Sequence, residues 1–202
     1  TNNLGRRAGI LFRGVEDTSE FCQLAETMGI IIVEKIIQPG SIDAKGYFGK
    51  GRLQDVADEL RLRVDGHPWS EVDLVLIHTN ATPRQLVAVG EAAGVEVWDR
   101  VRLLLSLFTS HANSLEARTQ VRIARLQSDR TVLRELANQT TGNKFTKIKK
   151  QNGKIVDPNV VLVFDENIIN SLGLSKEYVD WMIVKLTNES DFQLEAGIMG
   201  HC

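Results

Sequence analysis

The apolar residues in the first hundred positions form short runs, separated by stretches with helical spacing. The runs are rich in β-branched and aliphatic side chains and predict four strands, at 8–12, 30–37, 72–77 and 95–98. Between them, apolar residues recur at every third and fourth position, which predicts amphipathic helices. Strands that alternate with helices favour βαβ crossovers. We therefore predict an α/β fold, a small parallel sheet with covering helices.

Capping sequences and apolar spacing locate the helices of this half. Two starts have the spacing of a capping box, Asp17 with Glu20 and Thr82 with Gln85. A further helix, directly after a glycine-rich loop, is predicted from its apolar face, which consists of Leu53, Val56, Ala57, Leu60 and Val64.

From Asp99 the pattern changes to long helices. A dense apolar helix runs to about Ala112, and a second helix continues from a polar break at 111–114 to about Asn138. The short join predicts a long antiparallel αα-hairpin. A packing seam along the second helix is predicted from residues that step by three and four, namely Ile123, Leu126, Arg130, Leu133 and Ala137.

The last sixty residues have a different character. Residues 144–154 contain five lysines and no acid, which indicates a flexible basic linker. A strand is predicted at 159–165 and a helix capped by Ser175, so the chain ends in a short α/β appendage. We divide the chain into an α/β subdomain (1–98), a helical hairpin (99–142) and a basic linker with an unassigned C-terminal segment (143–202).

Composition places the chain among soluble globular proteins, since 43% of its 202 residues are apolar and 25% are charged. The net charge of −2 means that nucleic acid could be bound only through a local basic patch. Cys22 and Cys202 have no metal-binding or disulfide spacing. Since no apolar run could span a bilayer and no secretory pattern opens the chain, we expect a cytoplasmic protein without membrane contact. The absence of an initiator methionine indicates a fragment or a processed chain.

The loop Gly46-Tyr-Phe-Gly-Lys-Gly-Arg52 has the composition of a phosphate-binding loop. A Walker A motif requires G-x-x-x-x-G-K-[ST], but the outer positions here are Ala44 and Gly51. The four histidines are scattered, so we predict no catalytic residue and no metal ligand. Backbone amides ahead of the following helix could still hold an anion, with Gly49, Lys50, Gly51 and Arg52 as candidates. The alternative is that the glycines only permit a tight turn.

A second candidate site lies on the hairpin. Arg118, Arg122 and Arg125 are spaced i, i+4, i+7 and form one basic stripe on the second helix. Two interpretations stay open, a solvated helix face and a surface that binds nucleic acid.

Several motifs in the same order resemble HflX-type GTPases. The run Tyr47–Leu53 is similar to their Y-[IF]-G-x-G-[KR]-[LV] loop, and Thr82-Pro-Arg-Gln85 is similar to their [ST]-P-x-Q. Val97-Trp-Asp-Arg100, with the leucines that follow and Glu116–Val121, resembles their V-x-D-R…E-G-K-x-Q-V signature. The resemblance covers roughly residues 5 to 141.

The resemblance implies an N-terminal α/β subdomain and a hairpin whose tip binds rRNA of the large ribosomal subunit, in ribosome splitting or rescue. The rRNA-binding residues would be His111, Asn113, Ser114, Arg118, Arg122 and Arg125, with Lys147, Lys149 and Lys150 of the basic linker. GTP and Mg²⁺ are the cofactors of the family. ATP is implied as a ligand of the Gly49–Arg52 loop, because the N-terminal part of some members binds it.

The chain departs from the family after the hairpin. Residue 142 is followed by Asn-Lys-Phe, where the family has a glycine-rich segment and then Walker A. We therefore expect no cofactor in this chain and no GTP hydrolysis by it alone, with a G domain supplied beyond this fragment or by another chain. The alternatives are an adenine-nucleotide-binding module or ATPase that uses the Gly49–Arg52 loop, and a truncated paralogue that acts as a protein-interaction scaffold.

Overall fold

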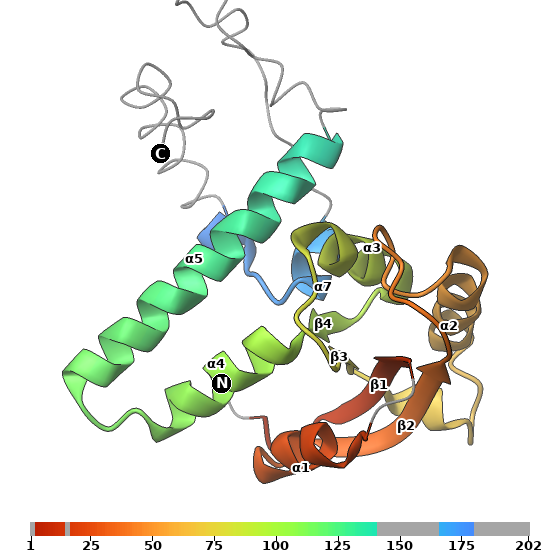
Figure 1. The fold of residues 1–202 in the computed structure, drawn as a ribbon, viewed down its shortest axis with the longest axis horizontal. Coiled ribbons are helices and arrows are strands. Elements are labelled where there is room, and N and C mark those ends of the chain that lie inside the picture. Colours follow the sequence, from red (N-terminus) through yellow and green to blue (C-terminus); the bar gives the residue numbers. More distant parts are fainter. Residues whose placement is uncertain (1–2, 15–16, 141–165, 180–202) are drawn as a thin grey trace, which may run out of the picture.

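A four-stranded parallel sheet forms the centre of the α/β part of the molecule (Figure 1). The computed structural model describes residues 3–14, 17–140 and 166–179. The strands follow the order β2-β1-β3-β4, and the predicted sheet is confirmed. Their bounds are Arg7–Arg13 (β1), Ile31–Gln38 (β2), Leu74–Ile77 (β3) and Glu96–Trp98 (β4).

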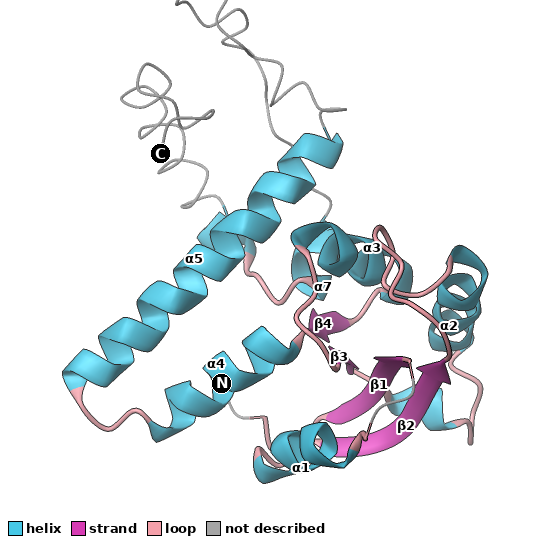
Figure 2. Cartoon of the chain, viewed as in Figure 1, coloured by secondary structure: helices cyan, strands magenta, loops and turns pink. Residues whose placement is uncertain are grey.

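Helices cover both faces of this sheet (Figure 2). On one face α1 (Ser19–Thr27) and the start of α4 (Arg100–His111) pack over apolar side chains of β1 and β3. The other face is covered by α2 (Lys50–Leu62), the 3-10 helix η1 (Pro68–Glu71) and α3 (Pro83–Ala93). Because β3 is buried along its whole length, its sequence is apolar at every position.

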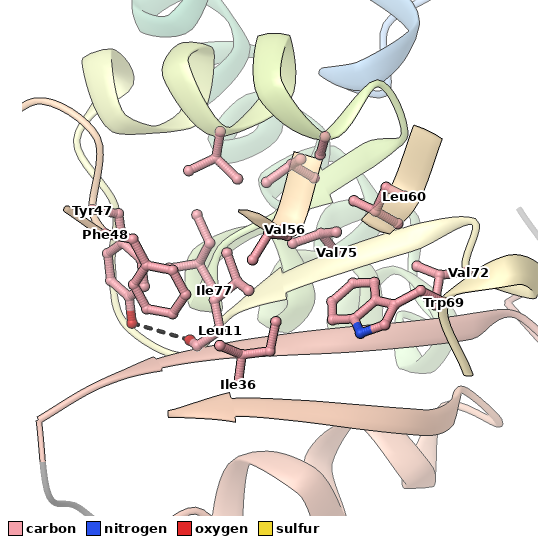
Figure 3. Close-up of a cluster of buried hydrophobic side chains, with 13 residues drawn as sticks. Leu11, Ile36, Tyr47, Phe48, Val56, Leu60, Trp69, Val72, Val75 and Ile77 are labelled. Atoms are coloured by element: carbon pink, nitrogen blue, oxygen red, sulfur yellow. Dashed lines mark hydrogen bonds between the residues drawn. The ribbon is translucent and has the colours of Figure 1, made fainter. Parts of the chain in front are cut away.

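The core under α2 includes two aromatic residues from the glycine-rich loop (Figure 3). Tyr47 and Phe48 are completely buried and their rings stack. The Tyr47 hydroxyl lies 3.1 Å from the carbonyl oxygen of Leu11 and 2.7 Å from His78 Nδ1. Tyr47 has a φ of +67°, a left-handed conformation that a bulky residue adopts only when its surroundings impose it. The loop is therefore anchored to the sheet by its aromatic half.

One of the two predicted capping boxes is present. At α3 the Thr82 hydroxyl accepts from the Gln85 amide, and the Gln85 side chain accepts from the Thr82 amide. At α1 the prediction is wrong, because the N-cap is Thr18, whose side chain makes no capping hydrogen bond, and Asp17 Oδ1 accepts only from the Ser19 amide, at 2.8 Å. Glu20 instead accepts two hydrogen bonds from Arg100, at 2.6 and 2.8 Å, and a charge-assisted bidentate pair is stronger than a bond to one amide.

The end of α2 also differs from the prediction. The helix ends at Leu62, Arg63 adopts a left-handed conformation with φ +40°, and Val64 lies outside the helix with 56% of its surface exposed. Val64 has the spacing of the apolar face of α2, although it is exposed in the loop after the helix. The sequence pattern therefore predicts a longer helix than the structure has.

The predicted antiparallel hairpin is formed by α4 and α5 (Leu115–Thr140), which is more than twice as long as α4. Figure 1 shows it projecting from the sheet, with the joining turn at the far end. The predicted seam along α5 is only partly formed. Leu133 and Ala137 are buried, whereas 44% of Ile123 is exposed. The physical reason is a change of partner, because α5 packs against α4 near the tip and against α3 beyond it.

A C-terminal segment packs beside this second half of α5. It comprises α7 (Glu166–Ser171) and a further helical stretch that begins at 176. The Ser175 hydroxyl accepts from the Tyr178 amide, so the predicted cap is present. The segment, α3 and α5 share a buried cluster that consists of Val87, Val132, Leu133, Leu136, Ile169, Leu172, Leu174 and Val179. The predicted strand at 159–165 lies outside the described residues, and the division at 98 and 142 stays a prediction.

Candidate nucleic-acid interface and anion groove

Hydrogen bonds within the hairpin fix its tip. The Ser114 hydroxyl accepts from the Ala117 amide at 3.0 Å and caps α5. Arg118 Nε donates to the carbonyl of Ala112 at 3.0 Å, across the turn. His111 Nδ1 lies 2.9 Å from the carbonyl of Leu107 at the end of α4. Ser114 and Arg118 therefore shape the turn, and Asn113, which directly precedes Ser114, is exposed.

The three arginines of the stripe differ in their surroundings. Arg118 and Arg122 are exposed, and within the described residues no carboxylate pairs with either of them. Arg125 is half-buried, and its Nε lies 3.8 Å from Asp129 Oδ2. Asp129 is buried, and its closer partner is Arg102 of α4. The guanidinium groups of Arg118 and Arg122 are therefore exposed to solvent, whereas Arg125 shares the Asp129 carboxylate with Arg102. The predicted lysines Lys147, Lys149 and Lys150 lie outside the described residues.

The glycine-rich loop leads directly into α2, whose N-cap is Gly49. The Gly49 amide donates to the Gln38 side chain at 3.2 Å, so this amide is occupied. Lys50, Gly51 and Arg52 are exposed in the first turn, where backbone amides have no partner within the helix. Gly49 has a φ of −59°, and a Cβ on Gly51 would meet no atom within 4 Å. Backbone conformation therefore requires a glycine at neither position.

A groove with a volume of about 620 Å³ opens beside this loop. Its walls are the 43–53 loop, α3 and the C-terminal end of α5, and its charged lining residues are Asp43, Lys45, Lys50, Arg84 and Glu135. The size suits a small organic ligand, since such pockets usually measure about 300 to 1,000 Å³. Of the four predicted anion-binding residues only Lys50 lines the groove. Arg52 lies 3.8 Å from Asp55 instead.

Asp43 organises the loop at the mouth of this groove. Its Oδ1 accepts from the amides of Gly46 at 2.6 Å and Lys45 at 2.8 Å. These bonds, led by the one from Gly46, lower the pKa of Asp43. The carboxylate is therefore ionised at neutral pH and turned toward its own loop. Lys45, Arg84 and Glu135 were missed from the sequence, because they come from three separate segments without a shared motif.

Other site chemistries find no support in the part of the chain that the structure describes. Residues 3–14, 17–140 and 166–179 contain no group of three side chains suited to hold a metal ion. Within the same ranges, none of the helices combines the length and apolar character needed to cross a bilayer.

Comparisons with known proteins show which proteins this chain resembles. Residues 15–109 match the family described as GTP-binding GTPase N-terminal. The resemblance to the N-terminal region of HflX-type GTPases is confirmed. GTPase HflX of Hyperthermus butylicus is 28% identical over 128 residues, 62% of this chain and 33% of that protein. GTPase HflX of Caldanaerobacter subterraneus subsp. tengcongensis is 32% identical over 113 residues, which are 55% and 25% of the two chains. The chain thus spans about a quarter to a third of the length of these relatives.

A solved structure supports the same assignment. The crystal structure of a GTP-binding protein from the hyperthermophilic archaeon Sulfolobus solfataricus in complex with GDP matches with a TM-score of 0.52 at 26% identity. The match covers 70% of this chain and 41% of that protein.

Residues of the HflX-type motifs have clear structural roles in this fold. Asp99, just after β4, accepts from the amides of Arg102 at 2.9 Å and Ala81 at 3.2 Å, which ties α4 to the loop after β3. Gln85 donates to the carbonyl of Asp43 at 2.6 Å and so joins α3 to the glycine-rich loop. Much of this HflX-type signature therefore holds the hairpin and the loop in place on the sheet.

Proposed function

We propose that this chain is the ribosome-binding part of an HflX-type protein, and that its hairpin binds rRNA of the large ribosomal subunit in ribosome splitting or rescue. The observation that carries this proposal is the open pair Arg118 and Arg122, on a hairpin that projects from the sheet. Guanidinium groups without a carboxylate partner are available for phosphate oxygens, and such contacts supply most of the affinity of proteins for nucleic acid.

The charge distribution supports the same interface. Residues 99–140 contain seven arginines and four acidic residues, whereas the whole chain has a net charge of −2. Positive charge is therefore concentrated on the hairpin, and a polyanion would be attracted to this end of the molecule. GTP and Mg²⁺ would act in a part of the protein outside the matched region, and the cellular location would be the cytoplasm.

Sedimentation with isolated large subunits at fixed Mg²⁺ and rising KCl tests this function. Each phosphate contact that is lost should flatten the plot of log affinity against log salt by about 0.7 to 0.9. The double variant Arg118→Gln, Arg122→Gln should therefore lose about 1.5 in slope and at least about tenfold in affinity at low salt. The matched control is Lys35→Gln, Arg61→Gln, which removes the same charge from exposed positions on β2 and α2.

Two results would refute the proposed binding to the large subunit. One is undetectable binding of the unmodified chain at low salt. The other is an equal loss of affinity in the hairpin variant and its control, because positive charge would then act without regard to position.

A second function is favoured by the groove beside α2. We propose that it binds a nucleotide through phosphate groups, since Lys45, Lys50 and Arg84 line it and the exposed first turn of α2 adjoins it. Isothermal titration with ATP and GTP would measure this. Arg84→Gln should weaken binding at least about tenfold while Arg61→Gln leaves it unchanged, and equal affinities of both variants would refute a site in this groove.

A further inference from the structure

A second, smaller groove lies between α5 and the helical turn at 176–179. Its volume is about 380 Å³, and it is lined by Arg122, Arg125, Leu126, Asp129, Glu177 and Tyr178. It therefore contains two of the three arginines of the stripe, together with two residues from the C-terminal segment. The sequence motifs that resemble HflX-type proteins end at about residue 141, so they assign no role to Glu177 or Tyr178.

Buried contacts position the C-terminal wall of this groove. Leu172, Leu174 and Val179 are buried in the cluster with α3 and α5. The carbonyl of Gly173 accepts from Arg102 at 3.1 Å. Gly173 has a φ of +67°, and a Cβ there would lie 2.2 Å from the Glu96 carboxylate, so the segment approaches β4 closely. Tyr178 is thus held against α5 by the packing on both sides of it.

Two guanidinium groups beside the groove compete for one buried carboxylate. Asp129 is shared between Arg102 and Arg125, so one buried carboxylate faces two guanidinium groups. Burial, followed by the positive charge of Arg102, lowers the pKa of Arg125. Arg122 adds a third guanidinium, and the exposed Glu177 offers one further carboxylate at the rim. An anion between Arg122 and Arg125 would pair with the guanidinium of Arg122, which has no ion-pair partner among the described carboxylates.

The other walls are apolar. Leu126 and the ring of Tyr178 line the same groove, and both are half-buried. Aromatic side chains provide surfaces on which unpaired bases stack. Two arginines beside an aromatic ring are the combination that binds one unit of a single-stranded nucleic acid.

We propose that this groove binds one nucleotide of single-stranded RNA, with its phosphate at Arg122 and Arg125 and its base against Tyr178 and Leu126. The proposal deepens the ribosome-binding function and rests on it, since rRNA is the polyanion that the hairpin would meet. It also gives the C-terminal segment a task, because Tyr178 completes a binding surface that α5 alone does not have.

The two tyrosines of the chain allow a direct test. Tyr178 lines the groove, whereas Tyr47 is completely buried under α2 and serves as an internal reference. The full chain, with ¹³C-labelled tyrosine rings, is titrated with hexauridylate and followed by NMR. We expect the Tyr178 ring signals to move to saturation while those of Tyr47 stay in place.

Variants of single arginines and a control ligand test which residues and which part of the RNA account for binding. Arg122→Gln should weaken hexauridylate binding at least about fivefold, whereas Arg61→Gln, at an exposed position of α2 outside the groove, should change it less than twofold. Inorganic phosphate at the same phosphate concentration should produce less than a tenth of the shift. If phosphate alone reproduces the shift, the groove binds free anions and the RNA assignment is wrong.

Failure of this inference can be told apart from failure of the proposed function. If large subunits bind through Arg118 and Arg122 while the Tyr178 signals do not respond to hexauridylate, the groove proposal is overturned and the function stands. If the Tyr178 signals respond as expected and large subunits do not bind, the groove binds RNA and the ribosomal function fails.

Discussion

At the scale of single residues, close contacts in the core determine which substitutions the fold tolerates. Gly9 lies in the middle of β1, and the ring of Trp69 from η1 packs directly over it. A Cβ at this position would lie 2.4 Å from a ring carbon of Trp69. Since that ring is itself buried, neither side can move away without disturbing the core.

Gly9→Ala should therefore lower the free energy of unfolding by about 1 to 3 kcal/mol, the usual cost of overpacking. Urea denaturation measured by circular dichroism would give this value. Gly51→Ala is the matched control, because its Cβ meets open space in a helical turn and should stabilise the chain by about 0.4 to 1 kcal/mol. Equal stability of Gly9→Ala and the unmodified chain would show that Trp69 does not pack as described.

At the scale of elements, the C-terminal segment packs Tyr178 against an ionic network of the hairpin. Arg102 of α4, Asp129 and Arg125 of α5, and Tyr178 meet where the segment crosses α5. Burial, followed by the negative charge of Asp129 and a hydrogen bond to it, raises the pKa of Tyr178 to about 12. The neutral phenol is therefore favoured in the folded state over the phenolate.

The sign of the resulting pH dependence follows from linkage. A folded-state pKa above the value of about 10 in an unfolded chain means that the contribution of Tyr178 to stability is complete below pH 10. It is lost as the pH rises through about 12. Absorbance at 295 nm should show one tyrosine ionising near pH 12 that is absent from Tyr178→Phe. An ionisation near pH 10 would show that the phenol is neither buried nor held beside Asp129 as described.

How far the sequence predicts these elements depends on the range of the interactions involved. The sheet, the box at Thr82 and the hairpin follow from local patterns, and the structure confirms them. The box at Asp17 failed because Glu20 pairs with Arg100, eighty residues away, and the seam is only partly formed because α5 changes its partner from α4 to α3. The two grooves combine residues from distant segments, so spacing alone did not reveal Lys45, Arg84 or Tyr178.

At the scale of the whole molecule, the free energy of local unfolding should differ between the two ends of α5. Val132, Leu133 and Leu136 are buried against α3 and the C-terminal segment. From 115 to 123, by contrast, most residues of α5 are exposed, including Leu115 at 83%. Few buried contacts hold that end of the helix, and local opening there requires little free energy.

Hydrogen exchange followed by mass spectrometry should therefore show a gradient along one continuous helix. We expect amides at 130–138 to exchange at least about a hundredfold more slowly than those at 116–122, with β1 and β3 slowest of all. Uniform protection along α5 would contradict this gradient and would indicate that the hairpin tip is held by contacts other than those described.

The unbroken course of α5 has a mechanical consequence. Its first residues adjoin the tip, and its last turns, with Glu135 and Gln139, form a wall of the groove beside Lys50. A helix of 26 residues is about 39 Å long, and it behaves as a stiff lever. A tilt of about 5° at the groove would swing the opposite end through about 3 Å, the length of a hydrogen bond. A ligand that tilted α5 at the groove would therefore displace the arginines near the opposite end of the helix.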